Sequence, residues 1–153
     1  MAAKQGWPVS GVDVAEAALI AARASAQDAN VSDRTTFERH DLGITFPTRK
    51  FDLVTAMFFH SPVDFGRLQA LRRTAESVAQ GGLLLVVAHG SRAPWSWADP
   101  DTVYPTEQDE LADLTVNTHE WRKVFVGPIE RDATGPDGQS AVVIDTVIAI
   151  ERS

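Results

Sequence analysis

The side chains of Asp13, Asp41 and His60 stand at positions where they can do chemistry. Asp13 closes a short apolar stretch, and a carboxylate at the end of a strand can accept charge-assisted hydrogen bonds from two hydroxyl groups of a ligand. It can also cap a following helix. Because a histidine ordinarily titrates near pH ~6.5, His60 can deprotonate a hydroxyl or amine. The alternative is that His60 is simply a histidine in the loop before a helix.

Three aromatic side chains, Trp95, Trp97 and Tyr104, lie in a segment rich in Pro, Trp and Asp that runs from Arg92 to Tyr104. Such a composition is typical of a long loop, and this loop is the candidate lid of the protein. The aromatic rings can form a wall for an apolar substrate, or they can pack the loop itself.

The remaining histidines, His40, His89 and His119, have neither the i, i+4 spacing nor the carboxylate pattern of a metal site, and we expect them to be structural or exposed. The chain contains no cysteine, which excludes disulfides, thiolate zinc sites and cysteine nucleophiles. The sequence therefore predicts no metal centre.

Composition narrows the class of protein. The chain has 153 residues, 44% of them hydrophobic, which suits a single domain over residues 1–153. No stretch of about 18 apolar residues is present, and no signal peptide is evident, so we expect a cytoplasmic protein. A net charge of -7 disfavours nucleic acid as a partner, because phosphate binding needs clustered Lys and Arg.

The first half of the chain alternates strands and helices. Residues 7–14 predict a strand, an alanine-rich segment predicts a helix to about Ala29, and Asn30 suits a left-handed stop. Residues 35–42 alternate in polarity, which indicates a strand near a sheet edge. Two nearly continuous apolar runs, 51–59 and 81–89, are typical of parallel strands in the centre of a sheet.

A helix is predicted between these two central strands. Ser61 is its expected N-cap, Pro62 takes the first helical position, and Gly81-Gly82 is its expected stop. Its predicted apolar stripe consists of Leu68, Leu71, Ala75 and Val78. A capped start at Thr106 predicts a further short helix, and Thr118 is a candidate cap for another turn.

The end of the chain predicts a different arrangement. Residues 121–134 and 140–151 flank a Gly-Pro-Asp-Gly turn, which indicates an antiparallel hairpin. Pro128 cannot donate to a ladder, so its strand should be at an edge, with the apolar second strand inside. The whole pattern predicts an open, doubly wound α/β fold with a mostly parallel sheet and helices on both faces.

This order of elements resembles the class I S-adenosylmethionine-dependent methyltransferase family, whose sheet ends in an antiparallel hairpin. Residues 8–13, 35–41, 51–58 and 82–89 resemble the second to fifth strands of the family, and the hairpin resembles the sixth and seventh. The resemblance implies S-adenosylmethionine as cofactor and a methyl group transferred to a small molecule.

The resemblance also implies roles for particular residues. Asp13, with Val14 beside it, matches the acidic position that binds the cofactor ribose, and Asp41 matches the residue that accepts from the adenine amino group, with Leu42 packing nearby. A solvated loop aspartate is the alternative for Asp41. Three further implied roles are cofactor contact for Met57 and Phe58 and substrate contact for His60. The aromatic residues 95, 97 and 104 match a segment that covers the substrate.

The sequence departs from the family at its beginning, because we find neither the first strand nor the glycine-rich cofactor loop. A strand and crossover helix need most of about 30 residues, so we expect an incomplete Rossmann-like fold that is truncated at the N-terminus. One alternative is an inactive remnant or assembly subunit, in a homodimer or with a strand-completing partner. Another is half of a nicotinamide-dependent dehydrogenase, which predicts parallel final strands and a G-x-G-x-x-G motif.

Overall fold

The computed structural model describes residues 2–59 and 66–153, which divide into two compact units, 1–47 and 48–153. Each unit has its own sheet and its own hydrophobic core. The single domain predicted over the whole chain stays a prediction. In the described part of the chain, no helix is both long and apolar enough to cross a membrane.

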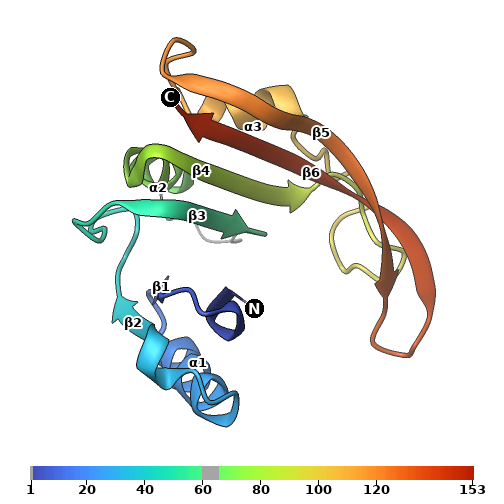
Figure 1. Cartoon of the computed structure of the whole chain (residues 1–153). Helices are drawn as coiled ribbons and strands as arrows, with labels where there is room; N and C mark the ends of the chain where they lie inside the picture. The colour runs from blue at the N-terminus through green and yellow to red at the C-terminus, as the bar shows by residue number, and fades with distance from the viewer. Residues whose placement is uncertain (1, 60–65) are drawn as a thin grey trace. The chain divides into compact units, whose positions relative to one another are not determined.

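The first unit is a strand–helix–strand motif (Figure 1). Strands β1 (Val9–Asp13) and β2 (Thr35–Arg39) pair in parallel, and helix α1 (Glu16–Asp28) connects them. Short 3-10 turns precede β1 at Ala2–Gln5 and β2 at Ser32–Arg34. These elements match the strand, helix and strand predicted from the sequence.

The core of this unit is built from small side chains. Ala3, Ala26 and Val31 are buried, and Phe37 of β2 packs against them. Asn30 adopts φ 55°, the left-handed conformation predicted for the residue that stops the helix.

The second unit contains a four-stranded sheet in the order β3-β4-β6-β5. Its strands are β3 (Phe51–Met57), β4 (Val78–His89), β5 (Trp121–Thr134) and β6 (Ser140–Arg152). Strand β3 pairs with β4 in parallel, whereas β6 is antiparallel to both β4 and β5. The sheet is therefore mixed, and the expectation of a mostly parallel sheet is corrected for this unit.

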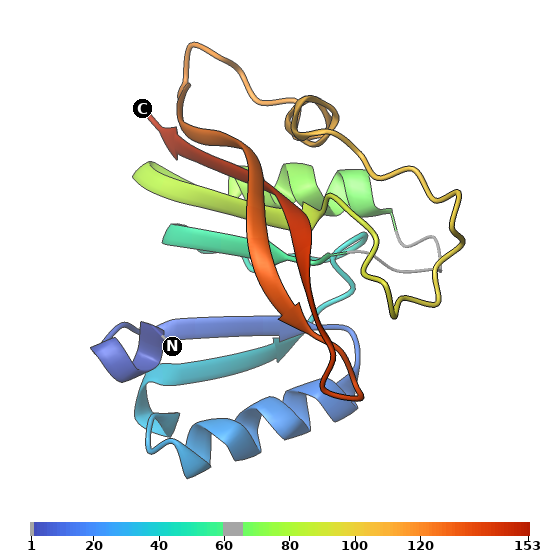
Figure 2. The same ribbon diagram turned by 90° about the vertical axis from the view of Figure 1, so that its right-hand side faces the viewer.

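The terminal hairpin is confirmed, as is its order in the sheet. Strand β5, which contains Pro128, is at the edge, and the apolar β6 is inside. The antiparallel ending contradicts the dehydrogenase alternative, which needs parallel final strands. The two long strands leave the sheet together as a curved ribbon (Figure 2).

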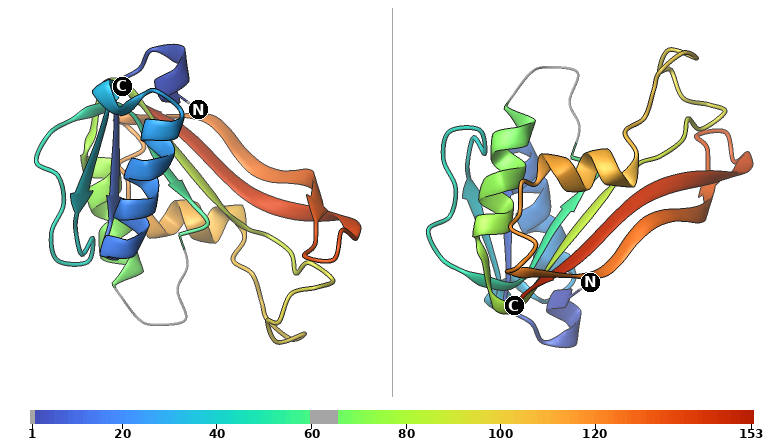
Figure 3. Two further views of the ribbon diagram at one scale, coloured as in Figure 1. Left: turned by 90° about the horizontal axis from the view of Figure 1, so that it is seen from below. Right: turned by 90° about the horizontal axis from the view of Figure 1, so that it is seen from above.

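Helices α2 (Arg67–Glu76) and α3 (Glu107–Asp113) cover the same face of this sheet (Figure 3). Both contribute to one core with the inward side chains of the strands. Its fully enclosed members are Leu71, Ala75, Val78, Leu84, Val86, Leu114, Ile148 and Ile150. Since α1 belongs to the other unit, helices on both faces of one sheet remain a prediction.

The helix predicted between the central strands is present, but its end is earlier than expected. Helix α2 stops at Glu76, and Gly81 and Gly82 lie within β4. The backbone there is irregular, because the pairing register shifts between Phe51 and Leu53 and Gly81 has φ 75°. The glycines serve this bulge rather than a helix end. The predicted start at Ser61 and Pro62 lies outside the described residues.

The capped start of α3 is confirmed. The Thr106 hydroxyl accepts a hydrogen bond from the Asp109 amide at 3.2 Å, and the Asp109 carboxylate accepts one from the Thr106 amide at 3.0 Å. The hydrogen bonds from Thr106 lower the pKa of Asp109. The next turn begins one residue before Thr118, because the Asn117 side chain accepts from the His119 amide at 3.0 Å.

Candidate functional site

Two of the predicted carboxylates lie next to the carboxyl ends of neighbouring parallel strands. Asp13 ends β1, and Asp41 follows β2 by two residues. The backbone carbonyl of Asp13 accepts a hydrogen bond from the His40 amide at 3.0 Å, which continues the strand pairing to the position before Asp41. The structure therefore brings the backbones of Asp13 and Asp41 together at one edge of the first unit.

The Asp13 side chain turns toward its own backbone. Its Oδ1 accepts a hydrogen bond at 2.8 Å from the amide of Ala15, the residue at the N-cap position of α1. This contact orders the strand-to-helix turn and leaves the second carboxylate oxygen available for a ligand. The side chain of Val14 is exposed beside it, at 55%.

Asp41 forms a tight turn at the end of β2. Its Oδ1 accepts from the Gly43 amide at 3.1 Å, and its carbonyl accepts from the Ile44 amide at 2.8 Å. The residue is exposed, and Leu42 is half-buried. This turn orients the carboxylate, and an exposed aspartate in such a turn is also compatible with the alternative of a solvated loop residue.

Met57 and Phe58 lie at the end of β3 in the second unit. Met57 is 56% exposed, and Phe58 is 37% exposed. Phe58 adopts φ 52°, a conformation that is rare for a bulky residue, while its amide still donates to the Val87 carbonyl at 2.7 Å. Its ring stacks on the ring of His89, with centroids 4.6 Å apart.

His60, the candidate catalytic residue, lies outside the described residues. The three candidate substrate aromatics are in the segment between β4 and α3. Trp97 is fully exposed, whereas Trp95 and Tyr104 are half-buried. Trp95 packs against the hairpin, since a Cβ added to Gly135 would lie 2.7 Å from its ring. The contact is with the turn between β5 and β6, so both the substrate role and the loop-packing role of Trp95 stay predictions.

An arginine that the sequence analysis did not single out lies beside Phe58. The guanidinium carbon of Arg131 is 5.8 Å from the centre of the Phe58 ring. Its Nε and Nη2 donate to the two carboxylate oxygens of Asp145 at 2.6 and 3.3 Å, and this bonding raises the pKa of Arg131. One feature of the sequence could have indicated this pair. Asp145 is a charged residue within the apolar inner strand 140–152, and a buried charge requires a partner.

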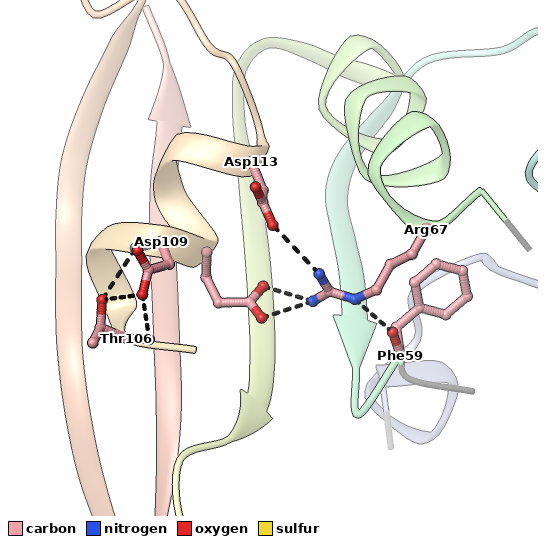
Figure 4. Close-up of polar contacts among 6 residues, drawn as sticks. Phe59, Arg67, Thr106, Asp109 and Asp113 are labelled. Carbon is pink, nitrogen blue, oxygen red and sulfur yellow. Dashed lines mark hydrogen bonds and ion pairs between the residues drawn. The ribbon is translucent and has the colours of Figure 1, made fainter. Parts of the chain in front are cut away.

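A second ion pair fixes the backbone just beyond β3 (Figure 4). Nη2 of Arg67 donates to both carboxylate oxygens of Glu110 at 2.8 and 2.6 Å, and Nε donates to the Phe59 carbonyl at 3.0 Å. Asp113 lies 3.7 Å from the same guanidinium. These contacts join α2, α3 and Phe59, so they support the backbone next to Phe58, just after β3.

Comparison with known sequences defines the family. The profile of a family described as a methyltransferase domain matches residues 1–82, which is more than half of the chain. The chain belongs to the class I S-adenosylmethionine-dependent methyltransferase family. No curated protein sequence matches this family member.

Solved structures have the same methyltransferase-like α/β fold. TehB from Haemophilus influenzae matches with a TM-score of 0.70 and 13% identity over 99% of this chain and 52% of TehB. A SAM-dependent methyltransferase from Methanosarcina mazei matches with a TM-score of 0.69 and 14% identity over 99% of this chain and 84% of its own. This methyltransferase family member thus spans about half the length of TehB.

A third structure was solved with a bound ligand. The glycopeptide N-methyltransferase MtfA, in complex with sinefungin, matches with a TM-score of 0.50 and 19% identity over 94% of this chain and 51% of MtfA. At these identities the three likenesses show the fold alone.

Proposed function

We propose that this chain binds S-adenosylmethionine and transfers its methyl group to a small molecule. The observation that carries the proposal is the pair Asp13 and Asp41, whose backbones meet at the carboxyl ends of β1 and β2. Open α/β sheets bind ligands at that edge. The complex of MtfA with sinefungin, an analogue of S-adenosylmethionine, supports the choice of cofactor.

The residues at this edge suit the adenosine part of the cofactor. The second oxygen of Asp13 can accept hydrogen bonds from ribose hydroxyls, and the ordered turn at Asp41 presents a carboxylate that can accept from an exocyclic amino group. Val14 and Leu42 supply apolar surface beside them. When bound, the cofactor supplies an activated methyl group.

The remaining roles complete the proposal. Met57 and Phe58 face the cofactor, and His60 removes a proton from the acceptor as the methyl group is transferred. Trp95, Trp97 and Tyr104 cover an apolar acceptor. The exposure of Trp97 is consistent with a ring that becomes buried only when substrate is present.

The cofactor proposal is tested by isothermal titration of the chain with S-adenosylmethionine and with its demethylated product. We expect saturable binding that Asp13→Asn weakens by about tenfold, because a charge-assisted hydrogen bond becomes a neutral one. Asp28→Asn is the matched control, since Asp28 is an exposed acid at the far end of α1. Absence of saturation at millimolar ligand would rule out cofactor binding by this chain alone.

The alternative function is a non-catalytic assembly subunit, in which another chain or a second copy adds a strand. One observation favours it: in the sheet formed by the described residues, β3 is an edge strand although it is largely apolar. Apolar edge strands tend to pair with other chains. Light scattering tests this alternative, and a well-folded monomer at low concentration contradicts it.

A further inference from the structure

Four side chains of the second unit gather beyond the carboxyl ends of β3 and β4: Phe58, His89, Arg131 and Asp145. His89 is paired with Asp145 in the register of β4 and β6, so the end of β4 lies beside the acid. Phe58 stacks on His89, and Arg131 reaches Phe58 from β5. Each of the four comes from a different strand or strand end.

Asp145 fixes the position of Arg131. The acid is only 5% exposed, and its two oxygens accept hydrogen bonds from Nε and Nη2 of the arginine. A guanidinium whose Nε and Nη2 are already hydrogen-bonded loses little side-chain conformational entropy when it binds a ligand. Its third nitrogen, Nη1, has no acceptor within residues 2–59 and 66–153, and the side chain is 45% exposed.

Apolar and aromatic surface lies next to this cation. Phe58 and His89 form a stack with an interplanar angle of 29°, and His89 is exposed. Met57 precedes Phe58 and is 56% exposed, and Ile129, opposite Asp145 in the β5–β6 register, is 44% exposed. A flat apolar ligand would cover surface that is otherwise in contact with water.

The backbone at Phe58 is strained in a way that points to function. A phenylalanine at φ 52° is disfavoured by contact of its Cβ with the backbone, and the hydrogen bond to the Val87 carbonyl holds it there. Strain of this kind concentrates at binding sites, where it aims a side chain. At this position it places the ring against His89 and Arg131.

We propose that Phe58, His89 and Arg131 form the acceptor subsite, and that the acceptor is a small planar molecule that carries a carboxylate. The ring of the acceptor contacts the Phe58–His89 stack, and its carboxylate accepts hydrogen bonds from Nη1 of Arg131. This inference rests on the proposed methyl transfer. Because Asp145 already balances the charge of Arg131, the affinity is modest.

The probe is benzoate, titrated into the full chain while the imidazole C–H signals are followed by NMR. The chain contains four histidines, and His89→Gln identifies the signal of His89. We expect a saturable shift of this signal with benzoate. Benzyl alcohol lacks the charge and acetate lacks the ring, so each should bind about tenfold more weakly.

Two arginine variants make the test specific. Arg131→Lys keeps the charge beside Asp145 but loses the fork, and it should weaken benzoate binding about fivefold. Arg122→Gln is the matched control, because Arg122 forms a cross-strand pair with Glu151 on the same hairpin. It should bind benzoate as the unmodified chain does.

Two results would overturn the subsite. One is the absence of a saturable His89 shift, both with and without the demethylated cofactor, and the other is equal binding by the Arg131 and Arg122 variants. The cofactor titration is independent of both. If the chain binds benzoate but not the cofactor, the proposed methyl transfer is contradicted and the site is one for aromatic acids. If it binds the cofactor but not benzoate, only this subsite is contradicted.

Discussion

Glu110 is a charged side chain that is almost wholly removed from water, at 1% exposure. Its charge is balanced by Arg67, whose contacts also hold the Phe59 carbonyl. A buried ion pair is a weak source of stability compared with apolar packing. Removing one member nevertheless destabilises the fold, because the other charge stays buried without its partner. The pair therefore links the stability of the second unit to the position of the segment after β3.

We expect Glu110→Gln to lower the free energy of unfolding by about 3 kcal/mol, because it removes the carboxylate that is hydrogen-bonded to Arg67 and leaves only the more distant Asp113 near that charge. Asp113→Asn is the control, since that carboxylate is 3.7 Å from Arg67 and 37% exposed. It should cost less than about 1 kcal/mol. Urea unfolding followed by circular dichroism measures both, and equal losses would contradict the assigned roles.

Only part of the candidate site could be predicted from the sequence. Asp13 ends one strand and Asp41 follows another, and both strands are recognisable by local pattern, so the place of each residue at a strand end could be predicted. The Arg131–Asp145 pair depends on cross-strand neighbours, and Phe58 meets His89 only because β3 and β4 pair in one register. Residue spacing along the chain carries no information on such contacts.

At the scale of elements, Gly82 shows where local patterns mislead. A Gly-Gly pair after a helix is typical of a helix stop, but this pair is in β4 beside a shift of register. A Cβ on Gly82 would lie 2.9 Å from the Ala79 carbonyl oxygen and 3.0 Å from that of Asp52. The glycine is needed for the close approach of two backbones, which depends on strand pairing.

Gly82→Ala should therefore destabilise the protein by about 1 to 3 kcal/mol, because backbone atoms must shift to admit the methyl group. Gly127→Ala is the matched control in β5, where the added atom would lie 3.4 Å from the Phe125 ring. We expect that control to change stability by no more than about 0.5 kcal/mol. Thermal unfolding of both variants measures this difference. An unchanged melting temperature for Gly82→Ala would refute the steric argument.

Most elements of the fold could be predicted because each has a strong local signal. The apolar runs of β3 and β4, the Thr106 cap of α3 and the turn between β5 and β6 all belong to this class. The mixed character of the larger sheet follows from the hairpin. The division of the chain into two units could not be predicted, because it depends on contacts between distant residues.

At the scale of the whole chain, the two sheets should differ in stability. Strands β4 and β6 each have a partner on both sides, whereas β1 and β2 form a sheet of two strands among residues 2–59 and 66–153. Two-stranded sheets are marginal, and their amides open more readily. We expect hydrogen exchange to be slower in β4 and β6 than in β1 and β2. Equal protection of the two sheets would be evidence against this difference.

The fold and the chemistry of the family are separate questions at this scale. One α/β scaffold serves many reactions, so the proposed methyl transfer depends on the residues of the site. Asp13 and Asp41 carry the cofactor proposal, and Arg131 carries the acceptor proposal. The experiments above test the two independently.

The order of strands in the larger sheet has a consequence for biosynthesis. Strand β6 is a direct neighbour of β4, yet β5 and its turn separate the two in sequence. A ribosome that has released β4 must still synthesise the whole hairpin before that strand gains its second neighbour. Until then the apolar β4 has an open edge that can pair wrongly. The nascent chain should therefore be most dependent on chaperones between residue 90 and residue 152, when β6 is complete.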